Sequence, residues 1–445
     1  MRQVLFIHYH FLPVHNVAVK RLLGYAQLLP DFGWRPIVLT REWRGLDEAD
    51  PSWGLSWEPE LEREVAFSIH RAPAQRSRRP IRCAPARPRQ LPRGRLGRLA
   101  DKVVAKSERL ARVLYGPYPD EFVSWVKPAV ATGLRLAREQ PFDAIMSYCP
   151  PETNHVVAHR LARRLDVPWV AFFGDLYGFI EKHLPAYSAE AFLRKAWHRC
   201  CLAPAAACAA VSPGMVDHLA RTYRKRVELV LTGFDPEELA GLIDDPPSRR
   251  GSFVVSHVGS IYPSEQRPQM FFDGLDRLLV EHPEIAPRLE VRFVGSKCDA
   301  ELREMLEGRP SAEVCTIEPK VDSVTAVSIV RASNALLAFT VLRDRHRTMS
   351  YPTKIFEAFG AQRPVLVVPG DDDWVDELLA RTNGGTSARD ANDVTAVLWK
   401  WFSCWQHEGC IPYPGKPDEI ATFSRRHQVE RLARLFDSVC RRPVR

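Results

Sequence analysis

Short apolar runs alternate with amphipathic stretches along the first half of the chain. One amphipathic stretch, Ala18–Leu29, repeats apolar residues at the three- and four-residue spacing of a helix. The apolar runs have the length of buried strands and occupy Val4–His8, Pro36–Thr40, Ala144–Tyr148, Pro168–Phe173 and Ala206–Ser212. Buried strands that alternate with helices are typical of parallel strands joined by crossovers, so the pattern predicts a doubly wound sheet.

A second series of the same kind begins near Phe253. Its apolar runs occupy Phe253–Val258, Leu289–Gly295, Asn334–Thr340 and Pro364–Pro369. Two adjacent prolines and a run of charges in Asp235–Gly251 indicate a linker. The pattern predicts an α/β protein of two Rossmann-like domains, residues 1–235 and 236–423, with a final helix over 424–440 that packs back onto the first. Such domains bind ligands at the carboxyl ends of their strands, so we expect them to face each other across a ligand cleft.

Positive charge is concentrated in one segment. The chain of 445 residues has a net charge of +8. Ten arginines and no acidic residue lie between Arg71 and Arg98, and without them the chain would be slightly acidic. A protein that coats nucleic acid carries basic charge on the fold itself, so we expect no nucleic-acid partner.

The arginine-rich segment, residues 71–97, also contains many prolines and is predicted to be an insertion. An amphipathic helix is predicted to follow it, over Arg98–Tyr115. Two interpretations stay open: the segment and helix dock on an anionic membrane surface, or the segment is a solvated loop. We find neither a run long enough to span a bilayer nor a secretory signal, so we expect a cytoplasmic protein, peripheral on the inner face of the membrane in the first interpretation.

Cysteine and histidine patterns argue against metal and redox chemistry. The ten cysteines are scattered and form no CxxC pair. His8, His10 and His15 are close in sequence, but the strand and the proline among them do not suit a fixed cage, so no metal site is expected. Neither half of the chain contains a GxGxxG fingerprint, which disfavours an NAD- or FAD-dependent dehydrogenase.

Candidate chemistry is concentrated in Met349–Pro369. Pro352 suits the first position of a helix and Gly360 suits its C-terminal cap. Lys354 and Glu357 are three residues apart and share one face near the positive end of that helix. A cation there can meet a diphosphate, and the carboxylate can accept hydrogen bonds from ribose hydroxyls. On spacing alone, a solvated Lys–Glu pair on the helix surface is the favoured alternative.

This stretch resembles the nucleotide-binding signature of the large retaining GT-B glycosyltransferase family, the family 4-like enzymes also called glycosyl transferases group 1. The resemblance is carried by Pro352-Thr-Lys-Ile-Phe-Glu357 and by Arg363-Pro-Val-Leu366. It implies that Glu357 binds the donor ribose, with the donor also contacting Tyr351, Pro352, Thr353 and Lys354. The fuller signature has a second glutamate eight positions earlier, where this chain has Met349.

A loop at the start of the second domain extends the resemblance. Val258-Gly-Ser-Ile-Tyr-Pro263, followed by Arg267, is similar to the strand and loop that open the donor domain in this family. The resemblance implies that the backbone at Gly259 approaches the nucleotide and that Arg267 neutralises the diphosphate. A solvated loop arginine is the alternative for Arg267. Further similar segments are Val211–Gly214, Thr232–Asp235 and Asn383–Gly385.

Three residues of the first domain join the candidate site. The segments Ser147–His155 and Pro168–Tyr177 resemble a two-proline motif and a later Arg-Asp motif of the family, in which Gly174 replaces the arginine. The resemblance implies that Asp175 holds an acceptor hydroxyl and that His155 touches the donor sugar; a helix cap and a structural histidine are the alternatives. Asn16, in a first loop without glycine, is expected to tolerate positive φ beside the donor.

The resemblance implies transfer of a sugar from a nucleotide diphosphate sugar to a hydroxyl of a glycan or lipid-linked acceptor. Retention of anomeric configuration, a role in bacterial surface polysaccharide or glycolipid synthesis, and charge neutralisation by Arg267 and Lys354 without an essential cofactor follow from the same resemblance. A nucleotide-sugar epimerase and a non-catalytic scaffold protein of the same fold remain alternatives.

Overall fold

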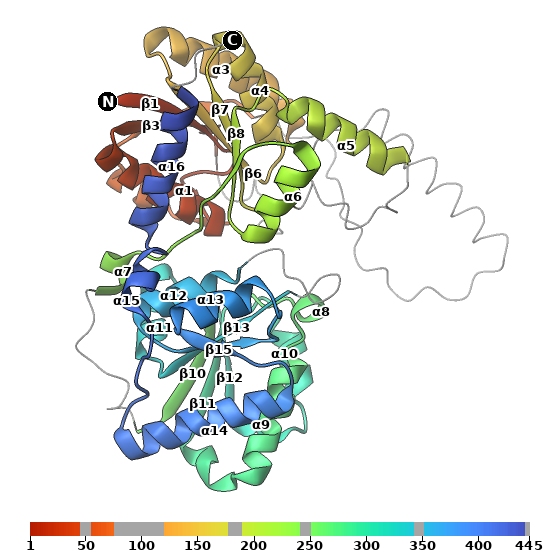
Figure 1. Cartoon of the computed structure of the whole chain (residues 1–445), viewed down its shortest axis with the longest axis vertical. Coiled ribbons are helices and arrows are strands. Elements are labelled where there is room, and N and C mark those ends of the chain that lie inside the picture. Colours follow the sequence, from red (N-terminus) through yellow and green to blue (C-terminus); the bar gives the residue numbers. More distant parts are fainter. Residues whose placement is uncertain (45–54, 75–119, 177–188, 241–250, 342–350, 441–445) are drawn as a thin grey trace, which may run out of the picture. The chain divides into compact units, whose positions relative to one another are not determined.

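The computed structural model describes residues 1–44, 55–74, 120–176, 189–240, 251–341 and 351–440 (Figure 1). The chain divides into two compact units. The first consists of Met1–Ala210, Met215–Leu229 and Glu430–Arg445, and the second of Val211–Gly214 and Val230–Val429. Each unit is built on one parallel sheet, which confirms the predicted α/β fold with two Rossmann-like sheets.

The sheet of the first unit has the strand order β5-β3-β1-β6-β7-β8-β9, and every neighbouring pair is parallel. Its strands are β1 (Arg2–Ile7), β3 (Trp34–Arg41), β5 (Ser68–Ala72), β6 (Ala144–Cys149), β7 (Trp169–Phe173), β8 (Ala207–Ala210) and β9 (Val227–Leu229). The central strands match the predicted apolar runs. The outermost strands, β5 and β9, were not predicted, because an edge strand is half-buried and lacks a continuous apolar run.

Helices connect the strands of this unit. They are α1 (Val17–Leu28), α3 (Val126–Glu139), α4 (Thr153–Leu165), α5 (Ala189–Leu202) and α6 (Pro213–Tyr223), with the 3₁₀ turns η1 (Leu29–Phe32), η4 (Pro59–Glu64) and η5 (Val123–Trp125). A small antiparallel pair joins β2 (Val14–His15) to β4 (Ser56–Trp57). The final helix, α16 (Arg425–Cys440), reaches this unit with its second half, where Phe436 packs on Trp34 and Asp437 accepts a hydrogen bond from the Trp34 indole at 3.0 Å.

The sheet of the second unit has the order β12-β11-β10-β13-β14-β15, again entirely parallel. Its strands are β10 (Phe253–Val258), β11 (Leu289–Val294), β12 (Cys315–Glu318), β13 (Ala335–Phe339), β14 (Val365–Val368) and β15 (Gly385–Ser387). Its helices are α7 (Pro236–Ala240), α8 (Pro263–Gln266), α9 (Gln269–Glu281), α10 (Asp299–Leu306), α11 (Ser323–Ala332), α12 (Thr353–Ala361), α13 (Trp374–Thr382), α14 (Ala391–Glu408) and α15 (Pro417–Ala421), with the turns η7 (Pro283–Arg288) and η8 (Pro310–Glu313).

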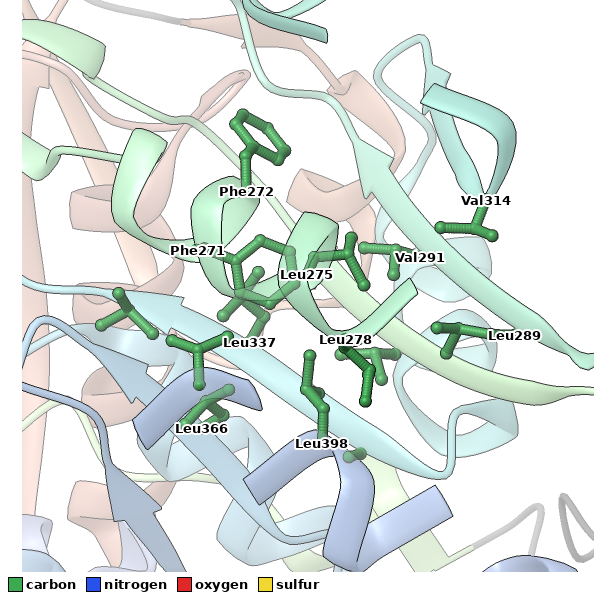
Figure 2. Packing of buried hydrophobic residues seen from close by; sticks show 14 of the residues in the cluster. Phe271, Phe272, Leu275, Leu278, Leu289, Val291, Val314, Leu337, Leu366 and Leu398 are labelled. Carbon is green, nitrogen blue, oxygen red and sulfur yellow. The ribbon is translucent and has the colours of Figure 1, made fainter. Parts of the chain in front are cut away.

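The core of the second unit is an apolar layer between its sheet and two helices. Figure 2 shows Leu275 and Leu278 of α9 beside Leu337 of β13 and Leu398 of α14, all of them buried. Each such side chain contributes about 1.5–3 kcal/mol to folding when it leaves water. This packing holds the strands in place, and the carboxyl ends of the strands carry the candidate site described below.

The first two residues of the predicted arginine-rich insertion belong to a strand instead. Arg71 and Ala72 are the last residues of β5, where Ala72 is fully buried and pairs with Arg41 of β3. The Arg71 guanidinium lies 2.6 Å from a carboxylate oxygen of Glu62. Residues 75–119, which include the predicted helix over 98–115, lie outside the described residues.

The end of α12 also differs from the prediction. Gly360 lies within the helix, and the C-terminal cap is Gln362, whose left-handed backbone (φ 53°) lets its N–H reach the carbonyls of Ala358 and Phe359. The C-terminal cap lies two residues later than predicted, because the residue that stops the helix is Pro364 and not Gly360. The intervening Arg363 donates to the Arg331 carbonyl at the end of α11, at 3.1 and 3.2 Å.

Candidate functional site

Helices α12 and α13 differ in whether a side chain accepts hydrogen bonds from the backbone N–H groups of their first turns. At α13 the buried Asp371 carboxylate accepts hydrogen bonds from the N–H groups of Asp373, Val375 and Asp376, at 3.1–3.2 Å. Burial raises the pKa of Asp371, and these backbone donors act in the opposite direction. The cap of α12 is Pro352, and among the described residues no side chain bonds the first N–H groups of that helix. Among the residues that the structure describes, the start of α12 is therefore the one of the two whose first N–H groups no side chain occupies, as a site for an anion requires.

Lys354 lies over bare backbone at the end of β10. A Cβ on Gly259 would come within 2.6 Å of the Lys354 ammonium, and Gly259 has a φ of 124°, so only glycine fits there without displacing the lysine. The lysine occupies the first turn of α12, where a cation opposes the helix dipole. An anion bound at this point would offset both the charge of the Lys354 ammonium and the partial positive charge at the start of the helix.

Glu357 supplies the carboxylate of the predicted pair. Its Oε2 lies 3.9 Å from the Lys354 ammonium, and its side chain is 43% exposed against 21% for the lysine. The two residues therefore share one helix face, as their spacing predicts. The cation turns toward Gly259, while the carboxylate stays accessible to a hydroxyl-bearing ligand.

His257 adds a buried neutral imidazole beneath this point. Its Nδ1 donates to the Leu337 carbonyl at 3.0 Å. Burial, and after it the charge of Lys354, lower the pKa of His257 to about 4. The ring therefore adds no positive charge at neutral pH. Sequence reasoning missed His257, although a polar residue inside an apolar strand just before Gly259 was a usable signal.

Arg267 lies on the loop that follows the same strand. It is exposed, has a left-handed backbone (φ 46°) and ends α8. The preceding Gln266 holds the loop, because its amide accepts from the Tyr262 N–H and donates to the Phe339 carbonyl, at 2.7 and 3.2 Å. Within the described ranges no carboxylate pairs with Arg267, so its charge remains available to a ligand.

The residues that precede Lys354 contribute packing and backbone. The Tyr351 ring lies edge-on against Phe356 at 5.8 Å, and burial raises the pKa of Tyr351. Pro352 caps α12, and Thr353 is the first residue of the helix. Met349, which replaces the second glutamate of the resemblance, lies outside the described residues.

In the first unit, Asp175 and His155 differ in accessibility. Asp175 is partly exposed and follows the carboxyl end of β7. His155 is fully buried near the start of α4, where Nδ1 lies 2.7 Å from the Ser147 hydroxyl and the ring packs on Phe173. Burial lowers the pKa of His155 to about 3. This environment favours the packing role over contact with a donor sugar.

Asn16 does not have the expected backbone. Its φ is −160°, and its side chain caps α1 by accepting a hydrogen bond from the Val19 N–H at 3.0 Å. Positive φ is not needed, because the loop turns before this residue and the asparagine acts as a helix cap. The expected tolerance of positive φ is thus not used at this position.

Asn154 organises the carboxyl edge of the first sheet, and sequence reasoning missed it. Its side-chain oxygen accepts from the Tyr9 N–H after β1, at 3.0 Å, and its nitrogen donates to the Tyr148 carbonyl in β6, at 2.7 Å. The neighbouring Thr153 N–H donates to the half-buried Asp120 carboxylate at 2.8 Å. Burial raises the pKa of Asp120 to about 7. No local pattern pointed to these contacts, since the partners are far apart in sequence.

The first histidine of the opening loop, His8, is held by the protein itself. His8 is buried, and its Nε2 lies 3.2 Å from the Pro150 carbonyl. Burial lowers the pKa of His8 to about 4. Across the part of the chain that the structure describes, no three His, Cys, Asp or Glu side chains gather as metal ligands would. The same part contains no helix that is long and apolar enough to cross a bilayer.

Several solved structures resemble this chain over nearly its full length. No family model matches it, and no curated protein sequence is similar to it. HepE from Anabaena, solved in complex with UDP and glucose, superimposes with a TM-score of 0.61 at 14% identity, over 98% of this chain and 100% of HepE. A glycosyltransferase from Rickettsia africae gives 0.59 at 11% identity, over 99% of both chains. Sucrose-phosphate synthase from Thermosynechococcus elongatus gives 0.58 at 13% identity, over 98% of this chain and 99% of the enzyme.

The fold is therefore the GT-B glycosyltransferase fold. It is shared over nearly the full length with enzymes of the kind that the Met349–Pro369 segment resembles, which confirms the resemblance at the level of the fold.

Proposed function

We propose that this protein is a glycosyltransferase that uses a nucleotide diphosphate sugar as its donor. The region 236–423 acts as the donor domain, and residues 1–235 act as the acceptor side. The single observation that carries the proposal is the start of α12: a helix N-terminus without a side-chain cap, with the Lys354 ammonium lying against the bare backbone of Gly259. That combination suits a diphosphate.

The remaining donor contacts follow from the same geometry. Glu357 is accessible on the face of Lys354 and accepts hydrogen bonds from ribose hydroxyls. Arg267, exposed on the neighbouring loop, adds positive charge for the diphosphate. Tyr351 and Thr353 border the start of the helix, and Pro352 caps it. No metal or other cofactor is required by this arrangement, because helix and side-chain charges neutralise the leaving group.

The reaction transfers the sugar to a hydroxyl of a glycan or of a lipid-linked acceptor. The acceptor oxygen bonds the anomeric carbon, and the bond from that carbon to the phosphate oxygen breaks. The nucleoside diphosphate leaves with the electron pair, and the hydroxyl proton is released. Asp175, accessible after β7, holds the acceptor hydroxyl. Retention of anomeric configuration and a role in bacterial surface polysaccharide or glycolipid synthesis belong to this proposal, and an NMR spectrum of the product tests the first.

Donor binding is tested with UDP by isothermal calorimetry and thermal shift, beside GDP and ADP. A ligand of the folded state raises the unfolding temperature by mass action. We expect Lys354→Ala and Glu357→Gln to weaken nucleotide binding roughly tenfold or more, since each removes a charge-assisted contact. Lys400→Ala, which removes an exposed lysine of α14, is the matched control and leaves affinity unchanged.

Three outcomes separate the candidate functions. Release of UDP from UDP-glucose that depends on Glu357 supports the transferase. Conversion of the donor to an epimer without an acceptor supports the epimerase. Absence of nucleotide binding by the wild-type protein contradicts both and leaves the scaffold.

Membrane docking is the second part of the proposal. Nine of the ten clustered arginines follow β5, and each charge near an anionic surface contributes about 1 kcal/mol to membrane binding. Docking through the predicted helix 98–115 would bring a cytoplasmic enzyme to lipid-linked acceptors on the inner face.

A sedimentation assay with phosphatidylglycerol vesicles tests this docking. We expect wild-type protein to sediment with the vesicles and binding to weaken as salt is raised. A variant in which residues 75–98 are replaced by a short Gly/Ser linker keeps β5 intact and should stay in solution. Phosphatidylcholine vesicles are the control, and equal sedimentation of both proteins would contradict the docking.

A further inference from the structure

Tyr148 is enclosed at the carboxyl end of β6. Its side chain stacks on Phe172 of the neighbouring strand and meets His8 edge-on, with ring centroids 5.2 Å apart in both cases. These contacts leave the hydroxyl directed at the turn after β7. A Cβ on Gly174 would lie 1.7 Å from that hydroxyl oxygen. The hydroxyl therefore touches backbone that only a glycine leaves open.

Arg21 holds the same hydroxyl from the other side. It belongs to α1, is only 5% exposed, and its Nη1 donates a hydrogen bond to the Tyr148 hydroxyl. A guanidinium is charged at every accessible pH and is costly to bury, so a buried contact of this kind is specific. Because the phenol accepts from Arg21, its own proton is directed away from the arginine.

Asp175 follows Gly174 directly in the chain, so it belongs to the same turn that the Tyr148 hydroxyl contacts. Burial raises the pKa of Tyr148; the charge of Arg21 lowers it, and the charge of Asp175 raises it. The hydroxyl thus contacts a buried cation on one element and the residue that precedes Asp175 on another. A main-chain hydrogen bond from the Gly174 N–H to the Cys149 carbonyl, 2.8 Å long, ties the turn to the end of β6.

We propose that Arg21 and Tyr148 are positioning residues for Asp175. Their hydrogen bond, fitted against the bare backbone of Gly174, fixes the turn after β7 and with it the direction of the Asp175 carboxylate. The inference rests on the proposed function, in which Asp175 holds the hydroxyl that attacks the donor. Neither Arg21 nor Tyr148 touches the substrate; they act through Asp175.

A double-mutant cycle tests this inference. The assay measures release of UDP from UDP-glucose with water as the acceptor hydroxyl, and calorimetry measures UDP affinity. Asp175→Asn and Tyr148→Phe should each lower turnover roughly tenfold to a hundredfold, the range expected when a reacting group is misplaced. Because both act on one carboxylate, the double variant should be no slower than the slower single variant. UDP affinity should stay unchanged in all three.

Tyr25→Phe is the matched control. Tyr25 is also fully buried, belongs to α1 and packs on the same Phe172 at 5.9 Å. A variant at this position should keep wild-type turnover. Gly174→Ala, which forces the Tyr148 ring to move, should behave like Tyr148→Phe.

Three results would overturn the inference while the proposed donor stands. The first two are losses that multiply in the double variant and equal turnover of Tyr148→Phe and Tyr25→Phe. Wild-type protein that binds UDP but releases none from UDP-glucose would also overturn it. Wild-type protein that does not bind UDP, GDP or ADP would instead contradict the proposed function itself. If Tyr148→Phe does not fold, Arg21→Gln takes its place in the cycle, and the same comparison decides.

Discussion

The position of the Lys354 side chain depends on the absence of a Cβ atom at residue 259. Residue 259 has no Cβ, and the lysine ammonium fills the space where one would stand. Gly259 also has a backbone conformation, φ 124°, that side chains of L-amino acids rarely adopt. The same single position therefore decides both the local backbone and the location of the charge that would meet a diphosphate.

Replacement of this glycine tests that dependence. We expect Gly259→Ala to weaken UDP binding by roughly tenfold, because the new methyl group displaces a charge-assisted donor. Isothermal calorimetry gives the affinity. Gly33→Ala is the control: Gly33 also has positive φ (80°), but no atom lies within 4 Å of the added Cβ. It should cost about 1 kcal/mol of stability through strain and leave binding intact. Equal UDP affinity of the two variants would show that the space at 259 is not needed.

At the scale of elements, two helices at one sheet edge differ in how the backbone N–H groups of their first turns are hydrogen-bonded. The first turn of α13 is bonded by the buried carboxylate of Asp371, whereas α12 begins at Pro352 without a side-chain cap. The difference makes α13 a stable part of the frame and leaves α12 for a ligand. Asp371 thus contributes to the site indirectly, because its own carboxylate occupies the N-terminus of α13 where an anion could otherwise bind.

Loss of this internal cap should destabilise the second unit. We expect Asp371→Ala to lower the free energy of unfolding by about 1–2 kcal/mol, since a cap is lost and buried N–H groups remain. Urea denaturation followed by circular dichroism measures the change. Asp322→Ala removes the cap of α11, an exposed carboxylate bonded to the Thr325 N–H at 2.9 Å, and should cost less. A smaller loss for Asp371→Ala than for Asp322→Ala would contradict this account.

At the scale of the whole molecule, buried titratable groups couple folding to pH. Burial lowers the pKa of His8 and His257 to about 4 and that of His155 to about 3. Their contribution to stability is present above the unfolded pKa of 6.5 and is lost as pH falls toward these values. Burial acts oppositely on Asp120, whose pKa is raised to about 7. Its contribution is present below the unfolded pKa of 3.8 and is lost as pH rises through 7.

The histidines outnumber the aspartate, so acid should destabilise the protein. Each group changes the free energy of unfolding by about 1.4 kcal/mol per pH unit within its window. We expect the unfolding temperature to fall between pH 6.5 and pH 4.5. Asp120→Asn should make the fall steeper in the first unit, because the opposing group is removed. Thermal unfolding at a series of pH values checks both statements, and a flat or rising profile toward acid would contradict the histidine assignment.

What the sequence alone determined is the part of the protein that depends on near neighbours. The apolar runs placed the central strands of both sheets, because burial on two faces leaves a continuous local signal. The three-residue spacing placed Lys354 and Glu357 on one face of α12, because helix geometry is local. The resemblance to GT-B enzymes rests on the same short segments.

Only the tertiary structure decided which distant residues meet. Lys354 is 95 positions from Gly259, and Asn154 is 145 positions from Tyr9, so no local pattern encodes either contact. The burial of His155 and the pairing of the edge strands β5 and β9 also depend on residues that are distant in sequence. So does the Asp371 cap, which α13 has and α12 lacks. Burial and capping depend on what the rest of the chain brings alongside, and that is settled only when the sheets assemble.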